Sequence, residues 1–345
     1  LGPNNYLGRA YQQIPISITV EGANILTRSM IIFGQGVIRC HPYVLREIGL
    51  TRDPDEDRAA PEFDRTLCEH ISFICGNAAR ALLLGLSVAR LVNVSGAARE
   101  THRYFQHVTR FSAAFSLAAD VAMLSLGGDV KRRESLSARL GDVLSLLYLC
   151  SAVLKRYEDE GRQRQDLPLV EWALRDGLQR IEQAFDGFLR NFPMRWIAWP
   201  LRLITFPLGR RFGPPSDRLG HTVAHLLMDP GLPRYRVTAG MFIPREETEP
   251  LARLDLAMEC AVEAEPIEAK LRSAAKSAIL TVDGGAALVQ QALEKNVITL
   301  REAETLQRLE SLRRSCIMVD DFPADYGRKQ LAQVTEALTE TRKTA

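Results

Sequence analysis

Residues 18–28 read Ile18-Thr19-Val20-Glu21-Gly22-Ala23-Asn24-Ile25-Leu26-Thr27-Arg28, and we interpret the rest of the chain as helices that hold this stretch. Glu21 is the single carboxylate among apolar neighbours. Such neighbours disfavour the ionised form, so the side chain is suited to accept a proton near neutral pH. Gly22 has no side chain and lets a ligand approach the backbone N–H groups. Alternatively, Glu21 is an exposed acid that complements a helix dipole.

Four runs of sequence occur in an order that resembles a known family. They are Tyr11–Met30, Gly34-Gln35-Gly36-Val37-Ile38-Arg39-Cys40-His41-Pro42-Tyr43, Lys131-Arg132-Arg133-Glu134-Ser135-Leu136-Ser137-Ala138-Arg139-Leu140-Gly141-Asp142 and Lys155-Arg156-Tyr157. The stretch from Val20 to Arg28 resembles the acyl-CoA dehydrogenase motif in which an aromatic or aliphatic residue precedes a Glu-Gly pair and an Arg follows seven residues after the Glu. Over nearly its whole length the chain is similar to the C-terminal half of the large bacterial acyl-CoA dehydrogenases of fatty-acid degradation.

This resemblance implies a role for each residue of the motif. Glu21 would be the base that removes the α-proton of an acyl-CoA thioester while the β-hydrogen leaves as hydride to FAD. Its backbone N–H would hold the thioester carbonyl and stabilise the charge that develops there, and Gly22 would line the substrate. Backbone contacts to FAD would come from Ala23, Asn24 and Ile25. The family often carries Thr at the first of these positions and Gln or Asp at the third, so side-chain contacts from Ala23 and Ile25 are not expected.

The resemblance also predicts the fold and the activity. We expect an all-α fold, in which an acyl-CoA dehydrogenase C-terminal helical segment is followed by an additional helical-bundle domain. The predicted reaction converts medium- or long-chain fatty acyl-CoA to trans-2-enoyl-CoA, the first step of β-oxidation, in a homo-oligomer that passes electrons to an electron-transfer flavoprotein. The family's flavin site is built mostly upstream, so this stretch alone is expected to be inactive.

Two other interpretations remain open at this point. An acyl-CoA oxidase would share the motif but would pass its electrons to oxygen. A non-catalytic helical module that binds a membrane or a protein partner would have inherited the motif without the reaction.

Composition narrows the class of protein. The 46% hydrophobic content is enough for a sizeable core, and 44 basic against 42 acidic residues give no reason to expect a nucleic-acid partner. The six cysteines form no C-x-x-C pair, which fits a reducing cytoplasm. A peripheral position at the inner membrane is a separate expectation. No metal site is expected, because His221 and His225 share a helix face without a third ligand and His41 is interpreted as a helix-end side chain.

The spacing of apolar residues, and the stretches rich in proline and polar residues between them, divide the chain into six segments. They are the end of the catalytic helical domain (1–50), a linker rich in Asp, Glu, Arg and Pro (51–66), a helical bundle (67–190), a connecting segment (191–220), C-terminal helices (221–319) and a polar tail (320–345). Pro168 is placed to open a helix, and Thr299 with Glu302 has the spacing of a capping box.

The connecting segment contains a stretch, residues 191–212, in which aromatic and aliphatic residues alternate with arginines. Its three prolines and internal arginines argue against a membrane-spanning helix. One interpretation places Trp196, Trp199, Arg202 and Phe206 in contact with a membrane interface. The other is an extended segment that packs across the bundle or against a sister subunit.

Overall fold

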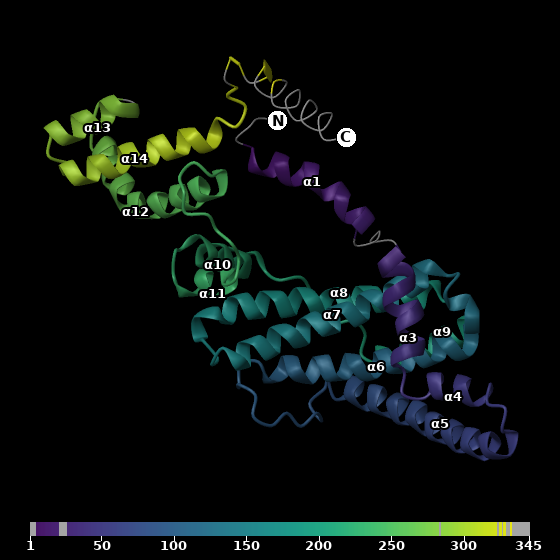
Figure 1. Cartoon of the computed structure of the whole chain (residues 1–345). Helices are drawn as coiled ribbons and strands as arrows, with labels where there is room; N and C mark the ends of the chain where they lie inside the picture. The colour runs from purple at the N-terminus through teal and green to yellow at the C-terminus, as the bar shows by residue number, and fades with distance from the viewer. Residues whose placement is uncertain are drawn as a thin grey trace. The chain divides into compact units, whose positions relative to one another are not determined.

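The structure, a computed structural model, describes residues 5–20, 26–282, 284–322, 324–325, 327–328 and 332. Within these ranges every regular element is a helix, which confirms the predicted all-α fold (Figure 1). The chain divides into two compact units. We call Ser17–Ala224 the bundle unit, and Leu1–Ile16 together with His225–Ala345 the terminal unit.

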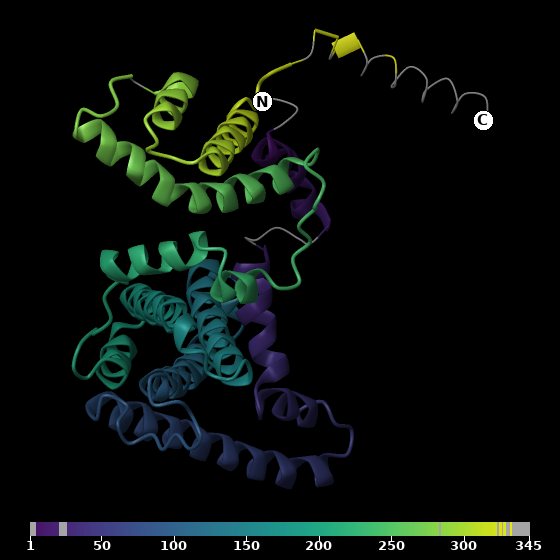
Figure 2. The same cartoon turned by 90° about the vertical axis from the view of Figure 1, so that its left-hand side faces the viewer.

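The bundle unit is built on four long helices, α5 to α8, with shorter elements around them (Figure 2). In chain order its elements are η1 (Thr27–Gln35), α3 (Gly36–Cys40), α4 (Val44–Leu50), α5 (Glu56–Leu86), α6 (His102–Leu126), η2 (Gly127–Val130), α7 (Glu134–Asp159), η3 (Arg164–Asp166), α8 (Leu167–Asn191) and α9 (Arg195–Thr205), with α10 (Asp217–Met228) beginning near its end. The break between α3 and α4 falls at Pro42, as its missing N–H and fixed φ predict.

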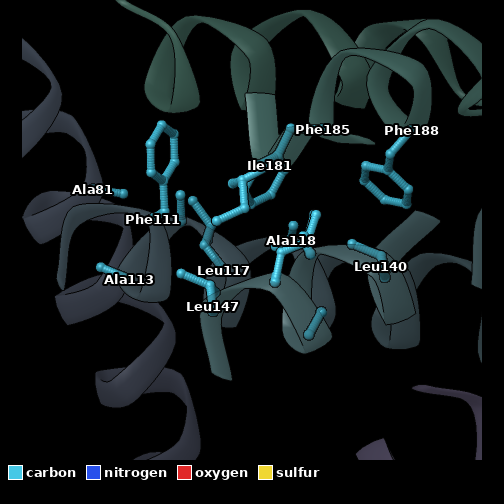
Figure 3. Close-up of a cluster of buried hydrophobic side chains, with 14 of the residues drawn as sticks. Ala81, Phe111, Ala113, Leu117, Ala118, Leu140, Leu147, Ile181, Phe185 and Phe188 are labelled. Atoms are coloured by element: carbon cyan, nitrogen blue, oxygen red, sulfur yellow. The ribbon is translucent and has the colours of Figure 1, made fainter. Parts of the chain in front are cut away.

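One apolar core holds α6, α7 and α8 together. Phe111 and Leu117 of α6, Leu140 and Leu147 of α7, and Ile181, Phe185 and Phe188 of α8 all belong to it (Figure 3). Each fully buried side chain of this kind contributes about 1.5–3 kcal/mol of transfer free energy. The stripe that the helical period places on α8 is buried along its whole length, at Val170, Leu174, Leu178, Ile181, Phe185 and Phe188.

Local signals set the helix boundaries where the sequence places them. Gly127, with φ +52°, ends α6, because a residue without Cβ adopts a positive φ at little cost. Pro168 lies in the first turn of α8, where its missing N–H leaves no bond unmade. Gly177 allows α8 to approach α7, since a Cβ there would lie 2.5 Å from Cys150 Sγ.

The predicted linker over 51–66 is wrong from Glu56 onward, where α5 begins. The Asp55 side chain accepts a hydrogen bond from the backbone N–H of Arg58 at 3.2 Å and so caps the helix. Glu56 and Asp57 lie in the first turn, where negative charge interacts favourably with the helix dipole. The acidic cluster is therefore a helix start. The predicted connecting segment, 191–220, belongs to the bundle unit and contains the helix α9.

The terminal unit has a second, smaller core. Its elements are the first part of α1 (Tyr6–Val20), then α11 (Leu232–Thr238), α12 (Pro250–Lys276), α13 (Gly285–Glu294) and α14 (Leu300–Ile317). Ile267 and Leu271 of α12 pack with Leu306 of α14. The predicted capping box at the start of α14 is confirmed, because Thr299 and Glu302 hydrogen-bond each other's backbone N–H groups. The predicted polar tail lies largely outside the described residues.

Two stretches of the described chain, His102–Val130 and Glu134–Asp159, are long and apolar enough to cross a membrane by length and composition. In the bundle unit 44% and 50% of these windows are buried. Core helices of soluble proteins pass the same test, so this is weak support for a membrane span.

Candidate functional site

The residues to which the sequence assigns catalysis and cofactor contact lie outside the described part of the chain. These are Glu21, Gly22, Ala23, Asn24 and Ile25. Their neighbours are described: α1 ends at Val20, and η1 begins at Thr27. The geometry on the C-terminal side of the motif therefore shows how it is attached to the bundle unit.

Arg28, the last residue of the motif, is fixed to α7 by an ion pair. Its Nε donates to Asp142 Oδ1 at 2.7 Å, and its Nη2 donates to Asp142 Oδ2 at 2.5 Å. Two parallel bonds of this kind combine charge with a defined geometry. The hydrogen bond to Asp142 raises the pKa of Arg28, and the guanidinium stays charged. The pair joins the first and third runs of the family resemblance.

Beside this ion pair, η1 approaches α7 closely where α7 carries a glycine. A Cβ on Gly141 would lie 3.1 Å from the carbonyl oxygen of Arg28 and 3.6 Å from Ile32 Cγ2. In the other direction, a Cβ on Gly34 would lie 3.4 Å from Ser137 Oγ. The residues that follow the Glu21 motif are thus positioned by backbone packing on α7 as well as by charge.

A buried cluster of four titratable side chains links α4, α5 and α6 to His41, the residue that follows α3. His41 Nε2 lies 2.7 Å from Asp120 Oδ1, and His70 Nε2 lies 3.4 Å from the same oxygen. On its other side, His70 Nδ1 lies 2.8 Å from Glu47 Oε1. The side chain of Asp120 is fully buried, and its Oδ2 has no hydrogen-bond partner among the residues that the structure describes.

The hydrogen bonds of His41 fix the position of its ring proton and weigh against a metal ion in this cluster. His41 Nδ1 accepts from the backbone N–H groups of Tyr43 and Val44 at 3.2 and 3.3 Å, which places the ring proton on Nε2, facing Asp120. The candidate ligand atoms of His41, His70 and Asp120 lie within 4.8 Å of one another. Coordination through His41 Nε2 would, however, move its proton to Nδ1, where two N–H groups already point. We interpret the cluster as a polar junction between helices, with His41 as the helix-end side chain that the sequence predicts.

The predicted membrane-contact residues separate into exposed and buried ones. Trp196 and Trp199 of α9 are 76% and 71% exposed, and Leu203, on the same helix face, is 65% exposed. Arg202 Nη1 is ion-paired with Asp186 Oδ1 at 2.7 Å. The prediction is wrong for Phe206, which is 6% exposed and packs its edge against the Phe185 ring in the core. An extended conformation is also excluded for residues 195–205, which are helical.

A second buried carboxylate, Glu182 of α8, anchors the chain that follows α9. Its Oε2 accepts the backbone N–H groups of Arg211 and Phe212 at 2.9 and 3.0 Å. Burial raises the pKa of Glu182, while these two bonds oppose the rise. The buried Arg110 lies near and donates to the carbonyl of Thr205 at 3.0 Å, at the last residue of α9. Both ends of the segment after α9 are therefore held by charged groups from α6 and α8.

Sequence reasoning did not find Asp120, Asp142 or Glu182. The sequence carries a signal for two of them, which is an acidic residue inside the apolar stripe of a helix. Such a residue is expected to be buried, and a buried acid almost always has a charged or hydrogen-bonding partner. Asp120 lies within Leu117-Ala118-Ala119-Asp120-Val121-Ala122, and Glu182 directly follows Ile181 in the α8 stripe. His221 and His225 are both exposed on α10, and all six cysteines are free.

Comparison with known proteins identifies one family. A family model described as acyl-CoA dehydrogenase, C-terminal, bacterial type, matches residues 38–322. The match includes the runs at 131–142 and 155–157 and begins after the motif that ends at Arg28. No solved structure matches the chain at a significant level.

Proposed function

The chain belongs to the bacterial-type acyl-CoA dehydrogenase C-terminal family, a family of oxidoreductases, and we propose that it is the C-terminal part of an FAD-dependent enzyme that converts medium- or long-chain fatty acyl-CoA to trans-2-enoyl-CoA in β-oxidation. The family match carries this proposal. It covers most of the chain and begins at residue 38, ten residues after Arg28 ends the Glu-Gly motif, so the motif and the matched region lie close together in one polypeptide.

In this proposal the chain's own residues remove a proton from the substrate and stabilise the negative charge that develops. Glu21 takes the α-proton of the thioester, and its backbone N–H holds the carbonyl oxygen on which negative charge develops. FAD, when bound, accepts the β-hydrogen as hydride. The backbone at Ala23, Asn24 and Ile25 is the proposed contribution of this chain to FAD binding, and Gly22 lines the substrate. The Arg28–Asp142 pair holds η1, the segment that follows these residues in the chain, on α7.

The proposed electron acceptor is an electron-transfer flavoprotein, and the proposed assembly is a homo-oligomer. An acyl-CoA oxidase is the alternative within the same chemistry. The full-length polypeptide, incubated in air with palmitoyl-CoA and an electron-transfer flavoprotein, is expected to form trans-2-enoyl-CoA only when the acceptor is present. Stoichiometric hydrogen peroxide without the acceptor would identify an oxidase, and absence of enoyl-CoA under both conditions would contradict the proposal.

A peripheral membrane contact from the cytoplasmic side is a second proposal. A membrane would also be the binding partner if the chain were the non-catalytic helical module considered as the alternative function. The observation that favours it is the exposed face of α9, where Trp196, Trp199 and Leu203 lie side by side at helical spacing. Tryptophan is enriched at the interface between lipid headgroups and acyl chains. Vesicle flotation of the full-length polypeptide that is lost in Trp196→Ser/Trp199→Ser would support the contact, and no flotation of the parent would refute it.

A further inference from the structure

Three arginines converge on one buried carboxylate where α8 meets α9. Asp186 of α8 accepts from Arg202 Nη1 at 2.7 Å, and Arg190 Nε lies 3.0 Å from its second oxygen. Arg210 Nη1 is 3.7 Å from that same oxygen. One negative charge thus faces three positive ones at Asp186, and of these three arginines Arg210 also interacts with the carboxylate of Glu182.

Arg195, in the first turn of α9, adds a fourth guanidinium to the same place. Its Nη1 donates to the backbone carbonyl of Arg190 at 2.8 Å, and no acidic side chain pairs with it among the residues that the structure describes. A cation in the first turn is also unfavourable with respect to the helix dipole. The four arginines therefore form an electropositive cluster that the protein itself neutralises only in part.

Three of the four arginines, all except Arg210, line a groove of about 190 Å³. Arg190, Arg195 and Arg202 form its polar wall, and Trp199 lies on its apolar side. The planar guanidinium group presents N–H donors in a fork that matches phosphate oxygens, so arginine is the preferred residue for phosphate recognition. The groove accordingly has the charge and the donors for a phosphate group, next to an aromatic ring.

The face of α9 beside the groove is apolar. Trp196, Trp199 and Leu203 follow one another at i, i+3 and i+7, and Arg195 and Arg202 lie together on the flank of this face. A ligand that satisfies both parts must carry its phosphate next to an apolar body. An anionic phospholipid in a bilayer has this arrangement, because its phosphate lies at the depth of the interfacial aromatic rings.

We propose that the groove of Arg190, Arg195 and Arg202 binds the phosphate of an anionic phospholipid and thereby docks the Trp196–Trp199 face of α9 in the membrane interface. This inference rests on the proposed peripheral membrane contact and adds its lipid class. Contact then depends on anionic lipid and weakens with salt, since exposed charges are screened beyond a Debye length.

The test is co-sedimentation of the full-length polypeptide with vesicles of phosphatidylcholine alone or mixed with phosphatidylglycerol. The parent is expected to bind the mixed vesicles in preference. Arg195→Gln is expected to lower the partition coefficient on mixed vesicles about fivefold, because that is the factor in membrane affinity that one basic side chain near an anionic surface contributes. Arg180→Gln is the matched control, since Arg180 is exposed on the same helix as Arg190 but outside the groove, and it is expected to bind like the parent.

Three outcomes would overturn the inference. These are equal binding of the parent to both vesicle types, equal binding of Arg195→Gln and parent to the mixed vesicles, and displacement of the protein from vesicles by free coenzyme A at constant ionic strength, which would assign the groove to a soluble phosphate ligand. Circular dichroism of each variant controls for folding. The vesicle assay contains no acyl-CoA and is independent of the separate measurement of flavin reduction by palmitoyl-CoA. Lipid binding by a polypeptide whose flavin palmitoyl-CoA does not reduce would refute the dehydrogenase proposal alone. Flavin reduction in a polypeptide that binds no vesicles would refute this inference and the membrane contact on which it rests, and would leave the dehydrogenase proposal intact.

Discussion

Arg28 and Asp142, which lie 114 residues apart in the chain, form a bidentate ion pair between η1 and α7. Arg28 ends the motif that carries Glu21, whereas Asp142 ends the third run that resembles the family. The pair therefore connects the segment assigned to chemistry with the helical bundle.

Removing either member of this pair is expected to cost about 1 kcal/mol of unfolding free energy, because the side chains are 53% and 32% exposed and water screens their attraction. Arg28→Ala, Asp142→Ala and the double variant are compared by urea unfolding. The double variant is expected to be scarcely less stable than either single one. Fully additive losses would show that the two side chains are not coupled.

The contact between η1 and α7 is expected to tolerate no side chain at residue 141. Gly141→Ala places a Cβ 3.1 Å from the Arg28 carbonyl oxygen, so η1 must move and stability falls by about 1–2 kcal/mol. The control is Gly76→Ala in α5, which has no neighbouring atom within 4 Å and is expected to gain about 0.5–1 kcal/mol from its helix propensity. A gain for both variants, measured by urea unfolding, would contradict the described packing.

Acidification is expected to destabilise the bundle unit through His107. Its pKa is lowered from 6.5 to about 4, first by burial and then by the charges of Arg103, Arg110 and Arg211. Between these values the unfolded chain binds a proton that the folded chain does not. The free energy of unfolding therefore falls as the pH falls from 6.5 to 4, by roughly 2–3 kcal/mol. Stability curves of the parent and His107→Gln should differ by this amount between pH 7 and pH 4, and parallel curves would exclude His107 as the cause.

The polar junction around Asp120 is expected to stabilise the bundle unit far more than a surface acid does. Asp120→Ala leaves His41 Nε2–H in a buried site without its acceptor and removes the carboxylate beside His70, at a cost of about 3 kcal/mol. Asp129→Ala removes an exposed carboxylate 3.7 Å from Arg132 and should change stability by no more than about 0.5 kcal/mol. Similar melting temperatures for the two variants would show that the junction contributes little.

Helix positions were predictable from the sequence because their signals are local. The α8 stripe, the glycine that ends α6 and the Thr299–Glu302 box each depend on residues within a few turns of one another. The start of α5 was missed because a cluster of acids and prolines is compatible with both a linker and a helix N-terminus. Only the Asp55 cap decides between them, and that depends on backbone geometry.

Long-range pairings were not predictable from one sequence. The contacts of Asp142 with Arg28, and of Asp120 with His41 and His70, join segments that no local pattern relates. Phe206 illustrates the reverse error: an aromatic ring between arginines satisfies the pattern of an interfacial anchor, yet the chain after α9 turns it into the core. The assignment of Glu21 as the base rests on the family motif, because Glu21 itself lies outside the described residues.

The most direct test of this account is an anaerobic titration of the full-length polypeptide with palmitoyl-CoA, in which flavin absorbance is followed for the parent and for Glu21→Gln. The account predicts that FAD is bound to both proteins and is bleached by substrate in the parent, with the rate lowered about 10²–10⁴-fold in the variant, the range typical of a lost general base. Equal bleaching rates in both would show that another residue is the base. A parent polypeptide that binds no FAD would contradict the dehydrogenase function itself.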